Sequence, residues 1–532
     1  MGVPYYFYVI TQTYEGILLQ HLPAFLKCHH FILDFNGLIH PSSQKYIKSL
    51  TKPPKDLEKG IMAAIWSDTQ DLIKLVQPLK TVQIYIDGVA PIAKMHQQRK
   101  RRFMSVYRKK VLCETNDAWD SNAISPATTF MCRLHASIKA YIRYSKAEFA
   151  YHFSSSDEPG EGEHKLFEKI ANKYNSPDEV KVIYGMDADL IMLALFSHIP
   201  KIFLLRENQH ATNEEDKYLY LDIDKLRSGI IADLRRTYNW NVSNDALDDT
   251  FNPSAKHVIE SYATVCFLMG NDFLPHPVCL NLKKNGLQYV LTHAGKIWNV
   301  TDSYHNKSGL NWAFISQLLE VLCQHESENM YNAVSEHSKK KAHFSTPAEE
   351  LEAYPLINKD PFESEFLQKK HWKPYYYKHL FNSTINDTVV INVSCELYLK
   401  GLMWTYLYYK RLPKDNQWYY PYGYAPTMHD LSNYLNSQIS VFEKLEDHWK
   451  TTYPRDIFCE PIVQLLSILP KESVECLPPK YRQLMINNEK LAYMYPISYS
   501  IQTFMKTKLW ECNQLLPPMN IEFVKKIVAT IK

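Results

Sequence analysis

The sequence predicts an α/β fold, with a parallel sheet flanked by helices in the first part of the chain and a mostly helical second region. Two observations lead to this prediction. Short apolar segments alternate with helical segments before residue 300, a pattern typical of parallel sheets that are covered on both faces. From residue 389 onward, Leu, Tyr and Trp recur in segments with a helical pattern.

Each expected strand leads into an aspartate. Residues 30–35 (HFILDF), 81–87 (TVQIYID) and 180–184 (VKVIY, followed by GMDAD) read as buried strands, because short apolar runs rich in β-branched and aromatic residues favour that state. In open α/β sheets, ligands bind outside the carboxyl ends of the strands. We therefore expect the chemistry of this protein at these strand ends.

The chain is expected to divide into three parts. An α/β unit spans residues 1–300, a variable linker or helical segment spans 301–388, and a second, mainly helical region spans 389–532. Within the middle part, residues 335–354 mix lysines, glutamates and a proline, which indicates an exposed helix or a linker.

Composition excludes several classes of protein. The 532 residues carry 60 Lys and Arg against 57 Asp and Glu, so the chain is neither a histone-like polycation nor an acidic tail. The ten cysteines form no CxxC pair, which argues against a zinc knuckle and predicts no disulfides. No signal peptide or apolar run of 18 residues is present, so no membrane span is expected. We expect an intracellular protein in the cytoplasm, with the nucleus left open.

Seven carboxylates stand out because they follow expected strands or flank expected helices. Glycine is scarce, yet six of the 15 glycines lie within three residues of these acids. Converging carboxylates repel each other unless cations lie among them, and oxygen ligands without His or Cys favour Mg²⁺ or Mn²⁺. Two such ions can activate a water and stabilise a leaving oxygen in phosphodiester hydrolysis. The candidate catalytic and metal ligands are Asp34, Asp87, Glu161, Glu163, Asp187, Asp189 and Asp272.

Each acid taken alone has a simpler explanation. An Asp after a strand is commonly a helix cap or a solvated turn residue, and Glu161 near a helix start would interact favourably with the helix dipole. Five acid-bearing elements at one edge of a single α/β unit are harder to explain in this way. The pattern therefore favours a metal-dependent site for phosphotransfer or hydrolysis.

A basic helix is expected directly after Asp87. Residues 94–110 hold eight Lys or Arg among 17 positions, and a guanidinium group matches phosphate with two parallel hydrogen bonds. A solvated helix face or a localisation signal are the alternatives, but the nearby acids favour a pocket for a terminal phosphate. Helical spacing places four candidate phosphate ligands on one face: Lys94, Gln98, Arg101 and Arg102.

Several motifs together resemble the Xrn family of 5′→3′ exoribonucleases. They include LDFNGLIH, IDGVAPIAKMHQQRKRRF, PGEGEHKLFEKI, YGMDADLIMLAL and GNDFLPH, followed downstream by GLMWTYLYYK and WYYPYGYAP. The resemblance runs from residue 1 to about residue 500 and is weak over 300–385. The long C-terminal extension of eukaryotic members has no counterpart in this sequence. The resemblance implies a catalytic domain related to PIN and flap-endonuclease folds.

The resemblance also implies roles for individual residues. The family's two-metal site would fall on the seven acids, and its pocket for a 5′-monophosphate would fall on the four residues of the basic helix. His40 would stack on the 5′-terminal base, with Trp418 as its partner. Such stacking tolerates any base. The alternatives are that Trp418 is a core residue and that His40 is an ordinary loop histidine.

The expected function is processive 5′→3′ hydrolysis of single-stranded RNA that carries a 5′-monophosphate, releasing 5′-mononucleotides with two Mg²⁺ or Mn²⁺ ions. A monomer is expected, and the sequence identifies no protein partner. Two rivals remain. One is a flap-type DNA endonuclease or 5′ exonuclease, and the other is an inactive RNA-binding scaffold. Clustered acids argue against the scaffold, because negative charge repels RNA phosphates.

Overall fold

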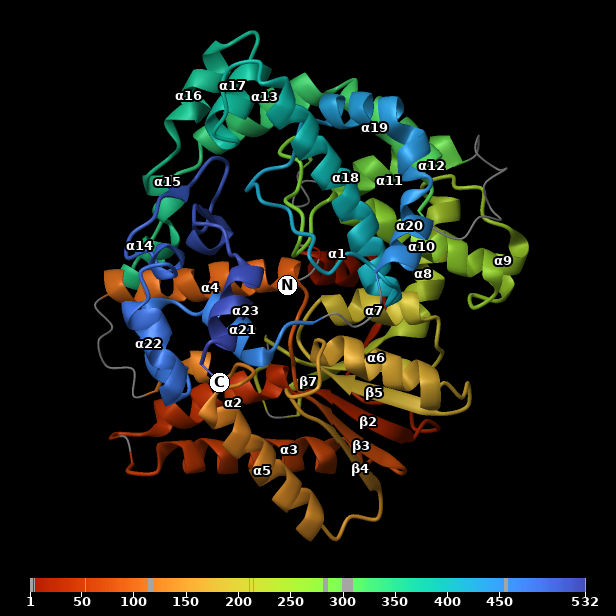
Figure 1. The fold of residues 1–532 in the computed structure, drawn as a ribbon. Coiled ribbons are helices and arrows are strands. Elements are labelled where there is room, and N and C mark those ends of the chain that lie inside the picture. Colours follow the sequence, from red (N-terminus) through yellow and green to blue (C-terminus); the bar gives the residue numbers. More distant parts are fainter. Residues whose placement is uncertain are drawn as a thin grey trace.

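A seven-stranded sheet organises the first half of the chain in the computed structural model (Figure 1). The structure describes residues 3, 5–52, 54–112, 119–209, 211–213, 215–280, 286–298, 310–453 and 458–531. The strand order is β1-β7-β6-β5-β2-β3-β4, in which β2 to β6 are parallel and β7 and β1 are antiparallel to their neighbours. The strands are β1 (Leu18–Leu19), β2 (Cys28–Asp34), β3 (Thr81–Tyr85), β4 (Ala150–Ser154), β5 (Val180–Tyr184), β6 (Ile202–Glu207) and β7 (Tyr218–Asp222).

The three strands expected from the sequence are β2, β3 and β5, and they are neighbours in the sheet. All five residues of β3 and of β5 are buried, because helices cover both faces of the sheet. The edge strand β4 is only partly buried, so its sequence lacks the apolar run that marks the others. Side by side, the carboxyl ends of β2, β3 and β5 form one continuous rim.

Helices α2, α3 and α5 cover one face of the sheet, and α6, α7 and α8 cover the other (Figure 1). The long helix α4 leaves the rim after β3 and coincides with the expected basic helix. The helices of this part are α1 (Tyr6–Thr13), α2 (Asn36–Ser49), α3 (Leu57–Val76), α4 (Ile92–Val111), α5 (Thr129–Tyr144), α6 (Gly162–Lys173), α7 (Asp189–Ser197), α8 (Ile223–Arg236), α9 (Asn244–Asp248), α10 (Pro253–Leu268) and α11 (Gly286–Trp298).

The regular structure of the described residues after 310 is helical, apart from the short strands β8 (Ile501–Gln502) and β9 (Asn513–Gln514). The fold class expected from the sequence, an α/β unit with a parallel sheet and a mostly helical remainder, is therefore confirmed. The helices are α12 (Trp312–Cys323), α13 (Glu326–Ser338), α14 (Pro347–Glu352), α15 (Tyr354–Ile357), α16 (Pro361–Gln368), α17 (Lys373–Leu380), α18 (Thr388–Lys410), α19 (Met428–Phe442), α20 (Leu445–Thr452), α21 (Pro461–Ile468), α22 (Pro479–Asn487) and α23 (Ile521–Ala529).

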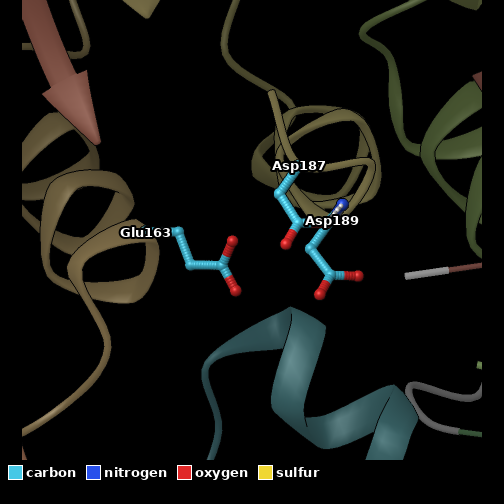
Figure 2. A group of neighbouring side chains, drawn as sticks. All are labelled: Glu163, Asp187 and Asp189. Atoms are coloured by element: carbon cyan, nitrogen blue, oxygen red, sulfur yellow. Dashed lines mark hydrogen bonds between the residues drawn. The ribbon is translucent and has the colours of Figure 1, made fainter. Parts of the chain in front are cut away.

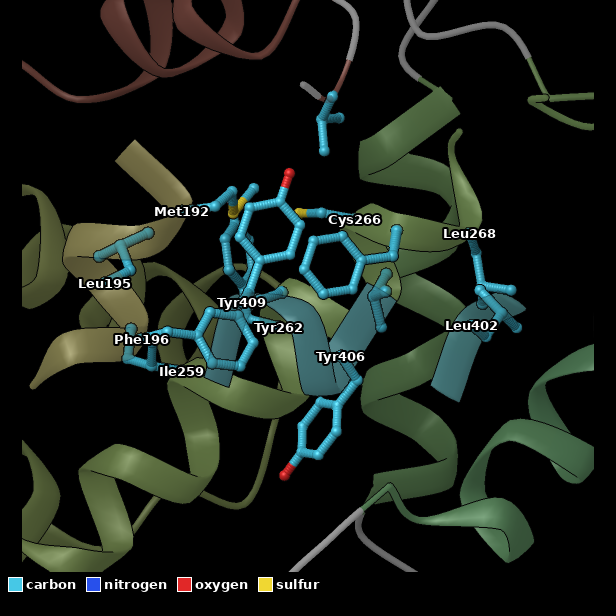
Figure 3. Close-up of a cluster of buried hydrophobic side chains, with 14 of the residues drawn as sticks. Met192, Leu195, Phe196, Ile259, Tyr262, Cys266, Leu268, Leu402, Tyr406 and Tyr409 are labelled. Carbon is cyan, nitrogen blue, oxygen red and sulfur yellow. The ribbon is translucent and has the colours of Figure 1, made fainter. Parts of the chain in front are cut away.

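Helix α18 joins the two regions into one core. It packs against α7 and α10 of the first region and against α19 of the second. Tyr409 of α18 stacks on Phe267 at a ring distance of 4.9 Å and lies 6.1 Å from Phe196, within the buried cluster drawn in Figure 3. Aromatic rings contribute large buried areas, so the end of α18 is held firmly against α7 and α10.

Two exclusions made from composition agree with the described part of the chain. No helix there is long and apolar enough to cross a membrane. The nine cysteines that lie in it are all free. Residues 339–350, within the segment expected to be an exposed helix or a linker, are almost all exposed.

Candidate active site

Four of the seven acids lie at the ends of β2 and β3 and at the start of α6. Asp34 is the last residue of β2, and Asp87 follows β3 by two residues. Glu161 is the N-cap of α6, and Glu163 lies in its first turn. Each is thus held at the end of a regular element rather than in a long loop.

The other three acids follow β5, begin α7 or follow α10. Asp187 follows β5, and Asp189 is the first residue of α7. Asp272 lies in the turn after α10, just beyond Gly270, whose φ of +92° favours glycine. The helix starts and turns therefore aim these acids toward β2 and β3.

Glycine at position 162 allows two of the acids to approach closely. A Cβ on Gly162 would lie 3.2 Å from Asp87 Oδ1 and 3.5 Å from Asp34 Oδ1. The Gly162 amide donates a hydrogen bond of 2.6 Å to Asp87 Oδ1. Asn36 also donates to Asp87 Oδ2 at 3.0 Å and accepts from the Asp87 amide, so the orientation of this carboxylate is set from two sides.

Lys94 lies among the acids. Its Nζ is 3.1 Å from Glu161 Oε2, 3.4 Å from Asp272 Oδ2 and 3.7 Å from Asp189 Oδ2. Burial alone would lower the pKa of the Lys94 ammonium, but the surrounding carboxylates, Glu161 and Asp272 first, raise it well above its usual value. Lys94 is therefore a fixed positive charge at the centre of the cluster.

Three carboxylates are arranged closely enough to share a cation. Each of Glu163, Asp187 and Asp189 offers one oxygen such that all these oxygens lie within 4.8 Å of one another (Figure 2). Burial, and then the charges of Asp187 and Asp272, raise the pKa of Asp189 to about 7. Burial and the neighbouring Asp189 raise the pKa of Glu163 as well. Burial and mutual repulsion thus disfavour the charged forms of the Glu163 and Asp189 carboxyl groups.

The donor set fits a divalent metal ion. Three of the seven carboxylates pair with Lys94 within the described residues, and Asp189 Oδ2, which lies 3.7 Å from Lys94 Nζ, accepts no hydrogen bond there. Hard oxygen ligands of this kind bind divalent cations. The cluster is thus compatible with metal binding at the rim of the sheet.

Two tyrosines of α18 hold the acids from the side of the helical region, and the sequence analysis missed both. The Tyr408 hydroxyl donates to Glu161 Oε1 at 2.7 Å and to Glu163 Oε1 at 3.4 Å. The Tyr409 hydroxyl donates to Asp189 Oδ1. The paired tyrosines at the end of an apolar helix were the only sequence signal, and nothing in the sequence links them to acids more than 200 residues away.

The expected phosphate-binding residues occupy different surroundings on α4. Lys94 is engaged by the acids, whereas Arg101 is exposed and has no hydrogen bond or ion pair in the described part of the chain. Arg102 donates to Ser125 Oγ at 2.7 Å. The Gln98 Oε1 atom is buried without a partner in the described structure. Gln98, Arg101 and Arg102 thus keep capacity to bind a further group.

His40 lies near Arg101 and Arg102 of α4. His40 is exposed to solvent, and partial burial of its ring, followed by the charges of Arg101 and Arg102, lowers its pKa. A neutral imidazole beside two guanidinium groups suits stacking and hydrogen bonding to a ligand that carries the negative charge.

Comparison with known proteins identifies the family. The model of the XRN 5′-3′ exonuclease N-terminus matches residues 1–208, and the model of the Xrn1 helical domain matches residues 254–363 and 324–532. The chain belongs to the Xrn family. It is 29% identical to the human 5′-3′ exoribonuclease 1 and 25% identical to that of Schizosaccharomyces pombe, in each case over 97% of this chain.

The matched part of these Xrn relatives is limited. The chain spans 33% of the human protein and 47% of the S. pombe protein. It also matches 5′-3′ exoribonuclease 2 of Kluyveromyces lactis, at 28% identity over 71% of this chain and 44% of the relative. Among solved structures, the T5 D15 protein co-crystallised with metal ions overlaps 57% of this chain at a TM-score of 0.27 and 12% identity, too little to support an argument.

Trp418, which the Xrn resemblance pairs with His40 for base stacking, is buried in the structure. Trp418 is only 6% exposed and packs on Trp404 at a ring distance of 5.3 Å. A Cβ on Gly401 would come within 2.5 Å of its ring, so α18 closes over one edge of the indole. A base-stacking residue needs an open ring face, and this position gives no support to that role. The alternative, that Trp418 belongs to the core, describes its surroundings.

We expect the hydroxyls of Tyr408 and Tyr409 to strengthen metal binding in this Xrn-family site, because they orient its carboxylates. Replacing a partner that orients metal ligands commonly weakens metal affinity about 10–100-fold. Tyr408→Phe and Tyr409→Phe should therefore raise the Mg²⁺ concentration required for half-maximal activity by about that factor, as measured by Mg²⁺ titration of RNA hydrolysis. Both changes keep the ring and hence the packing.

Tyr406→Phe is the matched control, because the Tyr406 hydroxyl lies on the same helix but donates to Glu260. It should leave the Mg²⁺ requirement unchanged. Equal shifts in all three variants would mean that the hydroxyls act on helix packing rather than on the acids.

Proposed function

We propose that the protein is a processive 5′→3′ exoribonuclease that hydrolyses single-stranded RNA with a 5′-monophosphate to 5′-mononucleotides. The observation that carries this proposal is the convergence of carboxylates around Lys94 at the rim of the sheet, in a chain of the Xrn family. The names of its relatives, 5′-3′ exoribonuclease 1 and 2, support the direction of cleavage and the substrate.

The acids of the rim would hold two Mg²⁺ or Mn²⁺ ions, with Glu163, Asp187 and Asp189 as one group of ligands. When bound, such ions favour ionisation of an attacking water and offset charge on a leaving oxygen. Asn36 keeps the Asp87 carboxylate in place, and the two tyrosines of α18 do the same for Glu161 and Asp189. Lys94 limits the repulsion among the acids and is close enough to attract a phosphate.

The 5′-phosphate would bind at Gln98, Arg101 and Arg102, beside the neutral ring of His40. This places the terminal nucleotide against α4 and the first phosphodiester over the acids, and correct positioning of reacting groups supplies much of the rate of an enzyme. A cap or triphosphate would be too large or too charged for this face. Release of one nucleotide presents a new 5′-monophosphate to the same residues, which favours processive action.

The test compares RNA substrates that differ at their 5′ end, together with flap DNA. We expect wild-type protein to release mononucleotides from 5′-monophosphorylated RNA in Mg²⁺, with much slower reaction on 5′-hydroxyl and 5′-triphosphate RNA and none in EDTA. Products are separated by electrophoresis or chromatography. Internal cuts in flap DNA would replace the proposal with a flap endonuclease. Tight RNA binding without Mg²⁺-dependent cleavage would replace it with an RNA-binding scaffold.

A further inference from the structure

Arg206 is a buried arginine close to the acid cluster, and the chemistry proposed above does not use it. It is the fifth residue of β6, whose first four residues are apolar and buried. Arg206 itself is only 6% exposed, and it pairs with no carboxylate within the described residues. A buried charge without a counter-ion is costly unless hydrogen bonds compensate it, so the hydrogen-bond partners of this side chain indicate its role.

Every side-chain hydrogen bond that Arg206 makes within the described residues goes to the turn that carries Asp187. Its Nη1 atom donates to the carbonyl of Asp187 at 3.1 Å and to that of Gly185 at 3.5 Å, and Nη2 donates to the carbonyl of Met186. These residues lie between β5 and α7. A planar guanidinium donates along fixed directions, so one side chain holds three successive carbonyl groups of the turn.

The sheet places Arg206 beside this turn. β5 and β6 are parallel neighbours, and the amide of Gly185 donates to the Leu205 carbonyl at 3.2 Å, so the next residue of β6 is level with the turn. The amide of Glu207 donates to Met186 Sδ at 3.1 Å. The end of β6 thus secures the turn through both its backbone and the Arg206 side chain.

The position of the turn sets the distances between the acids. A Cβ on Gly185 would lie 3.4 Å from Asp34 Cβ and only 2.2 Å from a methyl group of Leu190, so the turn packs directly against β2. The Asp187 carboxylate accepts a hydrogen bond of 3.3 Å from the amide of Asp189 and therefore follows the backbone. Functional groups must be held to within about 0.5 Å to act together, so a displaced turn would spoil the ligand set.

The ring of Phe7 covers the guanidinium. Phe7 lies on α1, with its ring centroid 4.4 Å from Arg206 Cζ, and such a contact favours a cation. Burial lowers the pKa of Arg206 to about 10, while the charge of Asp187 raises it, so the group stays charged near neutral pH. Arg206 therefore brings a lasting positive charge to the backbone that carries Asp187.

We propose that Arg206 is a positioning residue for the metal site, which fixes the turn of residues 185–187 and thereby places Asp187 among the other acids. The inference rests on the proposed metal-dependent exoribonuclease and adds a residue to its site. The guanidinium bonds to the backbone and not to the carboxylates, so it acts on metal binding only through the position and the charge balance of Asp187.

The test compares Arg206→Met and Arg206→Lys with wild type in the absence of RNA. The quantity measured is the Mg²⁺ concentration that gives half of the Mg²⁺-induced rise in unfolding temperature. Arg206→Met removes the charge and every donor, and it should raise this concentration about 10–100-fold, the usual effect of losing a group that orients metal ligands. Arg206→Lys keeps the charge but lacks the planar fork, so its value should lie between those of Arg206→Met and wild type.

Hydrolysis of 5′-monophosphorylated RNA supplies a second readout. Its Mg²⁺ requirement should rise in the same order, from wild type through Arg206→Lys to Arg206→Met. The KM for RNA, measured at saturating Mg²⁺, should stay close to the wild-type value, because Arg206 contacts the turn and not the basic face of α4.

Arg227 supplies the matched control. It is another buried arginine, 0% exposed, whose Nη2 donates to the Leu195 carbonyl at 2.6 Å and whose guanidinium lies 4.9 Å from the Phe251 ring centroid. Leu195 is near the opposite end of α7 from Asp189. Arg227→Met and Arg227→Lys should lower the unfolding temperature in EDTA but keep the wild-type Mg²⁺ dependence.

An unchanged Mg²⁺ dependence in both Arg206 variants would overturn the proposal. The same shift in the Arg227 variants would also overturn it, because loss of packing would then explain the effect. If Arg206→Met does not fold, the Mg²⁺ dependence of Arg206→Lys decides the question. A wild type that binds Mg²⁺ but does not hydrolyse 5′-monophosphorylated RNA would remove the exoribonuclease proposal alone, whereas a wild type with no response to Mg²⁺ would overturn both.

Discussion

Asp187→Asn is expected to slow hydrolysis of 5′-monophosphorylated RNA about 10³-fold or more, because a catalytic metal ion contributes several kcal/mol to the stabilisation of the transition state. Asp187 is one of three residues whose carboxylate oxygens lie within 4.8 Å of one another. The amide is similar in shape but uncharged, so it should bind a divalent ion poorly. RNA affinity should change little, since this carboxylate repels phosphate. Single-turnover kinetics and anisotropy measure the two quantities separately.

Asp178→Asn serves as the control, because this carboxylate is 95% exposed and precedes β5, at the opposite end of that strand from Asp187. It should leave both rate and affinity unchanged. Wild-type activity in Asp187→Asn would exclude this residue as a metal ligand. If Asp187→Asn lost both its hydrolysis rate and its cooperative unfolding transition, the substitution would be acting on folding.

Lys94→Gln is expected to destabilise the protein in EDTA by about 3 kcal/mol, the usual cost of removing one partner from a buried ion pair. Lys94 is 8% exposed and lies within 3.7 Å of three carboxylates. Its loss leaves these acids facing one another. Mg²⁺ should restore part of the lost stability, because a bound divalent ion offsets the same negative charge and stabilises the folded state. Urea unfolding with EDTA and with Mg²⁺ measures both effects.

The control for this variant is Lys74→Gln, which breaks an exposed ion pair with Asp71. Such surface pairs are worth roughly 0–1 kcal/mol, and the loss should not depend on Mg²⁺. Equal stability of Lys94→Gln and wild type in EDTA would show that Lys94 does not compensate the acids. Its part in the site would then be limited to attraction of phosphate.

The sequence analysis located the parts of the site that depend on local pattern. Apolar strands ending in Asp34 and near Asp87 predicted the rim, because a buried strand appears in the sequence as a short run of apolar residues. The helix carrying Lys94 and Arg101 was found from charge and spacing. The edge strand β4 and the antiparallel β7 escaped notice, because a half-exposed strand has no continuous apolar run.

Other features depend on contacts between distant segments. Tyr408 and Tyr409 reach acids of the first region only because α18 packs against α7 and α10. Lys94 lies on the helical face expected to bind phosphate, yet tertiary packing turns its ammonium into the acid cluster. Trp418 has an aromatic ring of the kind that stacks on bases. Its burial beside Trp404 follows from the packing of α18.

The sequence by itself determined the α/β class, the acids at the strand ends, the basic helix and the family. Each of these can be recognised from a short segment, by the spacing of its apolar or charged residues or by a motif. Only the tertiary structure decided which cation lies among those acids, which hydroxyls orient them, and that a cavity follows α4 from beside the site. The physical reason is that charge pairing and burial are set by distances between atoms in space. Residues such as Tyr409 and Asp189 are 220 positions apart in the chain and form a hydrogen bond only when it is folded.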